Sequence, residues 1–116
     1  MPLFVSQGRY TEGAIKAMLA KPEDRTAAVA KLVDRAGGKL IAFYLLFGEY
    51  DWMIVYEAPS GQEAAAIMLA AVGAGAITNT KTMLAMSGAE AQAAFELGRA
   101  LGAEHGVPGP SRAGRP

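Results

Sequence analysis

The segment from Lys39 to Glu57 most constrains the fold, because it predicts two strands that are apolar on both faces. Side chains of a strand point alternately to the two faces of its sheet. In the first strand, one face would carry Leu40, Ala42, Tyr44 and Leu46, and the other Ile41, Phe43, Leu45 and Phe47. In the second strand, Trp52, Ile54 and Tyr56 oppose Met53 and Val55. An antiparallel sheet with one face in water would alternate apolar and polar residues, so we expect both faces to be covered.

The rest of the chain predicts two further strands and three helical regions. Strands are expected over residues 3–7, 39–47, 51–57 and 77–86. Helical spacing predicts a helix after Thr11 that breaks near Lys21 and runs to Ala36, a second after Ser60, and a third from Ala89 to Leu101. The order βαββαβ with an added C-terminal helix is typical of the ferredoxin-like α+β fold. In that fold both main helices lie on one face of a four-stranded antiparallel sheet.

The pattern predicts a single domain over residues 1–102. From Gly102 onward the composition shifts to Gly, Pro, Ser and Arg without periodicity, so residues 103–116 are expected to form a disordered tail. The one histidine, His105, falls in this tail. A metal site or a catalytic triad needs ligands in fixed geometry, which a disordered tail does not provide.

Two helices can cover only one face of the predicted sheet. The simplest cover for the other face is a second copy of the chain, giving a homo-dimer or a higher oligomer of the dimeric α+β barrel type. Each large apolar side chain left exposed would forgo about 1.5–3 kcal/mol of burial. The alternative is that the C-terminal helix folds across the free face of its own chain.

The composition excludes several classes of function. Lys plus Arg and Asp plus Glu both number 11, so no basic excess indicates a nucleic-acid partner, and no segment resembles a membrane span or a secretory signal. Without cysteine there is no disulfide, thiolate metal site or cysteine nucleophile. We therefore expect a soluble cytoplasmic protein that uses no metal and no cofactor.

The run Gly48-Glu49-Tyr50-Asp51 lies at the turn between the two apolar strands. A structural interpretation explains it without a ligand: Gly48 would adopt a positive φ, Asp51 would accept hydrogen bonds from turn N–H groups, and Tyr50 would pack its ring. The functional interpretation makes the turn one wall of a pocket, in which Asp51 pairs with an ammonium group or polarises a hydroxyl.

Further candidate binding residues lie in the predicted strands. Lys81 and Arg9 could bind an anionic ligand, although such cations also guard sheet edges against pairing. Period-two spacing puts Thr80 on one face with Thr78 and Thr82, where hydroxyls could line a polar pocket. Tyr44 could line an aromatic cavity with Trp52 and Tyr56, or belong to the core or an interface.

Four motifs resemble the GYD domain family, which is named for a glycine–tyrosine–aspartate signature. They are Pro2-Leu3-Phe4-Val5, Gly8-Arg9-Tyr10-Thr11, Gly37-Gly38-Lys39-Leu40 and Gly48-Glu49-Tyr50-Asp51. The resemblance covers roughly residues 2–98 and implies a ferredoxin-like fold. It implies no particular activity.

A more distant resemblance concerns Gly48-x-Tyr50-Asp51 and the later run Ile77-x-x-Thr80-x-Thr82. These residues are similar to the ligand-binding domain of Lrp/AsnC-type regulators, ferredoxin-like dimers that bind amino acids between subunits. The chain has no N-terminal helix-turn-helix module, so this resemblance does not imply DNA binding.

Three functions remain open from the sequence. The first is a homo-oligomeric module that binds a small metabolite with Gly48, Tyr50, Asp51, Thr80, Lys81, Tyr44 and Arg9. The second is a small cofactor-free enzyme that uses Tyr44, Asn79, Lys81 and Asp51 in a closed apolar cavity. The third is an assembly subunit without a ligand.

Overall fold

The computed structural model describes residues 1–105 and contains four strands and four helices. The strands are β1 (Leu3–Tyr10), β2 (Lys39–Leu45), β3 (Trp52–Glu57) and β4 (Ile77–Ala85). The helices are α1 (Glu12–Ala20), α2 (Thr26–Arg35), α3 (Gly61–Gly73) and α4 (Gly88–His105). The chain divides into two compact units, Met1–Ala85 and a second that begins at Met86 and contains α4.

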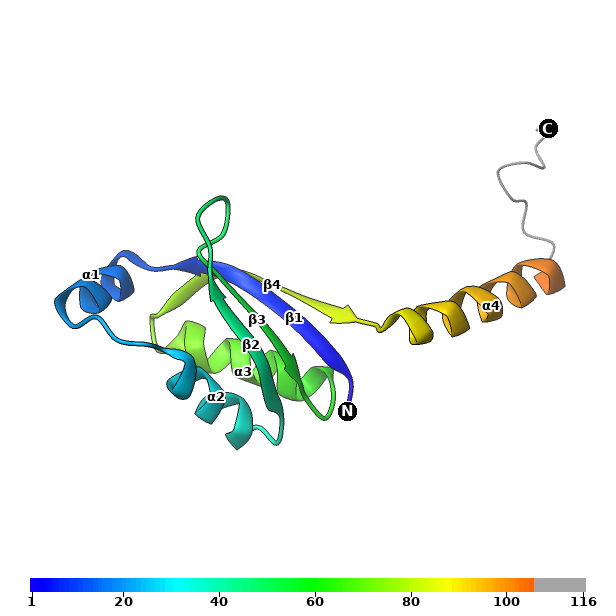
Figure 1. The fold of residues 1–116 in the computed structure, drawn as a ribbon, viewed down its shortest axis with the longest axis horizontal. Helices are drawn as coiled ribbons and strands as arrows, with labels where there is room; N and C mark the ends of the chain where they lie inside the picture. Colours follow the sequence, from blue (N-terminus) through cyan, green and yellow to red (C-terminus); the bar gives the residue numbers. More distant parts are fainter. Residues whose placement is uncertain (106–116) are drawn as a thin grey trace. The chain divides into compact units, whose positions relative to one another are not determined.

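The first unit is a four-stranded antiparallel sheet with the strand order β2-β3-β1-β4. Helices α2 and α3 lie on one face of this sheet (Figure 1). The predicted ferredoxin-like α+β fold is therefore confirmed. The predicted break near Lys21 is also confirmed, because α1 ends at Ala20 and α2 begins at Thr26.

The core lies between the sheet and these two helices. Its buried side chains include Phe4, Trp52, Ile54 and Tyr56 from the strands, Val33 from α2, and Ala64, Ile67 and Met68 from α3. The one buried polar side chain among the described residues is Ser6. Its hydroxyl lies 2.8 Å from the buried Tyr56 hydroxyl and 2.7 Å from the hydroxyl of the exposed Thr82, so the buried serine has two hydrogen-bond partners.

A β-bulge in β2 changes the face to which later side chains of the strand point, compared with what strict alternation predicts. Leu40 lies opposite Tyr56, but the register shifts before Ala42, which lies opposite Val55. Directly opposed residues share a face, so Leu40 and Phe43 point toward the helices, and both pack against the core. The sequence had put these two residues on opposite faces, because an extra residue in a bulge leaves no trace in the spacing.

A second irregularity separates the threonines of β4. The pairing of β1 with β4 shifts between Gln7 and Arg9, and Asn79 adopts a positive φ of 53° at this point. Thr82 lies opposite the buried Ser6, whereas Thr78 lies opposite the exposed Arg9. The predicted single row of Thr78, Thr80 and Thr82 is therefore wrong.

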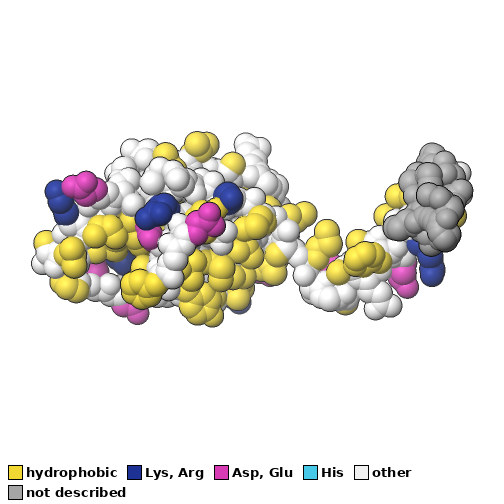
Figure 2. All heavy atoms as spheres, turned by 90° about the horizontal axis from the view of Figure 1, so that it is seen from above, with side chains coloured by type: hydrophobic (Ala, Val, Ile, Leu, Met, Phe, Trp, Pro, Cys, Tyr) yellow, Lys and Arg dark blue, Asp and Glu magenta, His cyan; other side chains and the backbone are white. Residues whose placement is uncertain are grey.

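The sheet face opposite α2 and α3, hereafter the open face, is apolar along most of its length. From the register it carries Leu3, Val5, Ala42, Tyr44, Met53, Val55, Met83 and Ala85. Tyr44 is 53% exposed and Met83 43% exposed. Hydrophobic side chains also gather on the surface that Figure 2 shows. The prediction that β3 is apolar on both sides is confirmed. That the open face is covered by a second copy of the chain, or by the C-terminal helix, stays a prediction.

The second unit is described only through α4. This helix continues to His105, so Ala103, Glu104 and His105 are helical and not the start of a tail. Residues 106–116 of the predicted tail lie outside the described residues. Among residues 1–105, no helix has both the length and the apolar character needed to cross a membrane.

Gly8 offers a direct test of the packing between β1 and β3. A Cβ atom at this position would lie 2.7 Å from Cζ2 of Trp52 and 3.0 Å from the Thr78 carbonyl oxygen. Trp52 is 3% exposed and cannot move aside freely. We expect Gly8→Ala to lower the free energy of unfolding by about 1–3 kcal/mol, measured by urea denaturation.

The matched control is Gly13→Ala in α1, where a new Cβ would meet no atom within 4 Å. Alanine favours helix over glycine, so this variant should be neutral or up to about 1 kcal/mol more stable. Equal stability of Gly8→Ala and the wild type would contradict the packing described here.

Candidate functional site

The turn between β2 and β3 is fastened to β1 through Asp51. Its backbone N–H donates to the Gly8 carbonyl at 2.8 Å, and its carbonyl accepts from the Leu46 N–H at 2.7 Å. Its carboxylate oxygen Oδ2 accepts a hydrogen bond from the Tyr10 N–H at 2.9 Å. The Asp51 side chain therefore does accept a backbone hydrogen bond, but from the neighbouring strand β1 and not from its own turn.

Arg9 lies against the same turn. Its Nε is 3.7 Å from Oδ2 of Asp51, and its Nη1 donates to the Glu49 carbonyl at 3.3 Å. The Arg9 side chain is 50% exposed, so the ion pair adds little to stability, but it holds the guanidinium at the edge of the turn. The Asp51 carboxylate is already engaged by two groups of the protein. This arrangement supports the structural interpretation of the aspartate.

Gly48 has a different role from the one predicted. The glycines with positive φ among the described residues are Gly37, at 84°, and Gly75, at 79°. Gly48 is not among them, and a Cβ there would meet no atom within 4 Å. The expectation of a positive φ at Gly48 is wrong, because the connection runs from Leu46 to Asp51 and is longer than a tight two-residue turn.

Tyr50 and Lys81 meet above the edge of the sheet. The turn carries Tyr50 to β4, where the Lys81 ammonium lies 5.4 Å from the centre of the tyrosine ring. This distance is within the range of a cation–π contact. The Tyr50 side chain, and to a smaller extent the Glu49 carboxylate, raises the pKa of Lys81 above its ordinary value. Lys81 is therefore a cation at neutral pH.

These residues surround an open pocket of about 460 Å³, hereafter the turn pocket. It is lined by Arg9, Glu49, Tyr50, Asn79, Thr80 and Lys81. Two cations, one carboxylate and one aromatic ring thus converge on a single opening. Such a set can bind a carboxylate through its cations, an ammonium through Glu49 and an apolar group on the Tyr50 ring.

The structure brings together part of the predicted binding set. Arg9, Tyr50, Thr80 and Lys81 line the turn pocket, while Gly48 and Asp51 lie in the turn beside it without lining it. Tyr44 lies far from the turn pocket. Tyr44, Met53, Gln7 and Lys81 lie side by side on the four strands, so Tyr44 and Lys81 are at opposite edges of the sheet. At about 4.8 Å a strand, that row spans roughly 14 Å.

The sequence did not single out Glu49 as a binding residue. Its position between Gly48 and Tyr50 was the available signal.

The residues proposed for a small enzyme are divided. Asn79 and Lys81 line the open turn pocket, Tyr44 lies exposed at the far edge of the sheet, and Asp51 is bonded to Tyr10. The aromatic set is divided as well, because Trp52 and Tyr56 are buried in the core and Tyr44 points to the open face. This arrangement gives no support to the catalytic alternative.

Asp51 can be tested for its structural role. In Asp51→Ala the Tyr10 N–H loses its acceptor, so we expect the free energy of unfolding to fall by about 1–3 kcal/mol. Asp51→Asn keeps an acceptor oxygen and should lose less. Urea denaturation gives both values, and hydrogen exchange at the Tyr10 amide should be faster in the alanine variant alone.

Asp34→Ala is the control, because Asp34 is exposed on α2 and should tolerate the change within about 0.5 kcal/mol. If Asp51→Ala were as stable as this control, the hydrogen bond from the Tyr10 N–H would not contribute to the free energy of unfolding.

Comparison with known proteins gives one family model and several solved structures. The family model described as GYD domain matches residues 4–95. No curated protein matches the sequence.

Among solved structures, FFRP-DM1 is 19% identical with a TM-score of 0.45, covering 74% of this chain and 100% of its own. A hypothetical protein from Pyrococcus horikoshii is 20% identical with a TM-score of 0.45, covering 75% and 92%. A protein from Thermus thermophilus is 16% identical with a TM-score of 0.42, covering 75% and 95%. Because the family model spans most of the chain, including the Gly-x-Tyr-Asp turn, nearly all of β1 and the other three strands, this protein belongs to the GYD domain family.

Proposed function

We propose that this protein is a small-molecule-binding module that works as a homo-oligomer and holds its ligand in the turn pocket. The observation that carries the proposal is the convergence of Arg9, Tyr50 and Lys81 from three separate elements on one opening. The Tyr50 ring under the Lys81 ammonium and the contacts of Arg9 with the turn hold these groups in place before any ligand arrives. Prepositioned groups lower the entropic cost of binding.

The charges of the turn pocket favour a small carboxylate or an amino acid. Lys81 is fully exposed to an incoming anion, and its charge is reinforced by its neighbours. Arg9 keeps half of its side-chain surface exposed despite its contact with Asp51, so it is accessible as a second donor. Glu49 adds a carboxylate that suits the ammonium group of an amino acid. The pocket would thus bind the carboxylate of an amino acid through its two cations and the ammonium group through Glu49.

A second copy of the chain is the proposed cover of the open face. A contiguous apolar patch of this kind is typical of protein interfaces, and a two-fold arrangement lets one surface cover itself. The polar residues lie at the two ends of the face: Lys39 and Glu57 at one end, Arg9, Gln7 and Lys81 at the other. Antiparallel stacking of two copies would place Glu57 of one near the cationic end of the other. Lys39 lies directly opposite Glu57, so the facing ends of two stacked copies would not both carry a net positive charge.

Ligand binding can be tested by a thermal-shift screen of the amino acids and small carboxylates. A compound present at 100 times its Kd should add about 2.7 kcal/mol to the stability and raise the Tm. Calorimetric titration of the best compound into Lys81→Met should then give a Kd about tenfold weaker or more, because a charged hydrogen bond is lost.

Lys31→Met is the control, since Lys31 is exposed on α2 and does not line the turn pocket. The proposal fails if no compound shifts the Tm, or if Lys81→Met binds as well as this control.

Self-association can be tested with two neighbouring residues of β4. Met83 lies on the open face opposite Val5, and Leu84 points to the other side of the sheet opposite the buried Phe4. Sedimentation at micromolar concentration should show a dimer or larger species for the wild type and for Leu84→Glu. Met83→Glu would bury a charge in the interface and should sediment as a monomer.

A monomeric wild type would exclude a second copy as the cover. The same response of both glutamate variants would show that the open face is not the interface.

A further inference from the structure

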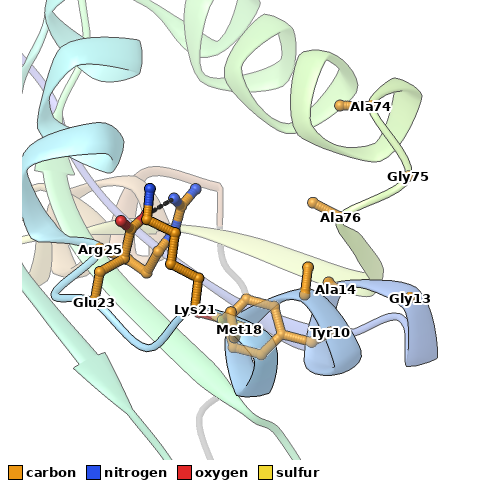
Figure 3. A pocket seen from close by; sticks show the side chains of 11 residues that line it. Tyr10, Gly13, Ala14, Met18, Lys21, Glu23, Arg25, Ala74, Gly75 and Ala76 are labelled. Atoms are coloured by element: carbon orange, nitrogen blue, oxygen red, sulfur yellow. Dashed lines mark hydrogen bonds and ion pairs between the residues drawn. The ribbon is translucent and has the colours of Figure 1, made fainter.

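A second opening lies on the other side of β1, between α1 and the loop that joins α3 to β4 (Figure 3). It has a volume of about 420 Å³, within the range of small-molecule sites. We name it the helix pocket. Its walls are α1, the connection from α1 to α2, and Ala74, Gly75 and Ala76 of the α3–β4 loop, with Tyr10 from the end of β1. It shares no lining residue with the turn pocket.

The walls of the helix pocket are fastened to each other by Thr11. Its N–H donates to the Ala76 carbonyl at 3.1 Å, and its hydroxyl donates to the Gly75 carbonyl at 2.6 Å. The same hydroxyl accepts from the Ala14 N–H at 3.1 Å and so caps α1. Gly75 adopts its positive φ in a turn that closes α3 through bonds to Val72 and Ala71. The opening is therefore built into the fold.

Small side chains on α1 keep this space open. The helix presents Gly13, Ala14 and Ala17 to the pocket, and none of its residues is buried. Met18 adds an adaptable apolar surface to the same wall. An apolar group in the pocket would cover these side chains, and α1 would gain packing that the chain alone does not supply.

Three charged side chains line the pocket on the side of the α1–α2 connection, across from the Ala74–Ala76 loop in Figure 3: Lys21, Glu23 and Arg25. Arg25 donates to the Glu23 carboxylate at 3.0 Å, and these two charges offset each other. Among the ion pairs of residues 1–105, none involves Lys21. The pocket therefore carries a net positive charge centred on Lys21.

Tyr10 adds a hydrogen-bond donor to the helix pocket. Burial raises the pKa of Tyr10 above its ordinary value; the Arg25 guanidinium opposes this rise, and the Asp51 carboxylate adds to it. The hydroxyl thus stays protonated at neutral pH. No hydrogen bond of the described side chains involves it, so its proton is available to a bound acceptor.

From these groups we propose that the helix pocket binds an organic carboxylate with an apolar body. The carboxylate would accept from the Lys21 ammonium and the Tyr10 hydroxyl. The apolar body would lie against Ala14, Met18 and Ala76. A purely polar anion would leave those side chains uncovered, and an amine would meet the charge of Lys21. The site differs from the turn pocket in its residues and in the apolar body it requires.

The test uses three probes with one body and different head groups: 3-phenylpropanoate, 3-phenylpropanamide and 3-phenylpropylamine. Each is titrated into the ¹⁵N-labelled full chain while amide shifts are followed by NMR. The propanoate should shift the amides of Ala14, Ala17 and Gly75 saturably, with a Kd at least about fivefold below that of the amide. The amine should be weaker than the amide.

Variants separate this site from the turn pocket. Lys21→Met should weaken propanoate binding about fivefold or more, and Lys21→Arg, which keeps the charge, should stay within about twofold of the wild type. Tyr10→Phe should also weaken it. Lys16→Met is the control, because Lys16 pairs with Glu12 on α1 and does not line the pocket.

Three outcomes would overturn the proposal: equal affinity for the propanoate and the amide, unchanged binding by Lys21→Met, or no saturable shift at about 20 mM probe, well above the Kd of a typical fragment. Shifts confined to Tyr50 and Lys81 would instead assign the anion to the turn pocket. That result would contradict this inference and would still agree with the proposed function.

Discussion

The sheet of this protein has apolar side chains on both faces, while its two packed helices cover only one of them. The covered side is closed by Trp52, Ile54 and Tyr56 against α2 and α3, and Ser6, the one buried polar side chain of residues 1–105, is bonded there to two hydroxyls. The open side leaves Tyr44 and Met83 in contact with water. Burial of such side chains is the main driving force of both folding and association. The uncovered face is thus the feature from which the proposal of a second copy follows.

Asp51 connects the functional features of the first unit. One carboxylate oxygen accepts from the Tyr10 backbone and lies near the Arg9 guanidinium, so it fixes two adjacent residues that point to opposite sides of the sheet. Arg9 lines the turn pocket and Tyr10 lines the helix pocket. The aspartate of the Gly-x-Tyr-Asp turn therefore supports both openings without lining either. A group held by its own protein is better suited to positioning neighbours than to binding a ligand.

The sequence predicted the strands, the helix break near Lys21 and the ferredoxin-like order, because these depend on local periodicity and on turn residues. It failed where one residue changes the register. The bulge between Leu40 and Ala42 and the positive φ of Asn79 reverse the faces of later residues without altering the composition. Arg9, Tyr50 and Lys81 were identified from their types and positions. The helix pocket was missed because its residues Tyr10, Lys21 and Gly75 come from distant parts of the chain. They are brought together by the hydrogen bonds of Thr11 to the α3–β4 loop, which the sequence pattern does not show.

The position of the turn pocket links the two parts of the proposed function. Lys81 and Arg9 lie at the cationic end of the open face. Along β4 and β1, this face continues from these two residues to the apolar centre. A second copy seated on that centre would reach over the same end and bring Glu57 close to the pocket. A ligand bound there would then contact both copies and favour the assembled state in proportion to its differential affinity. Linkage makes the effect reciprocal, so assembly must strengthen ligand binding by the same factor.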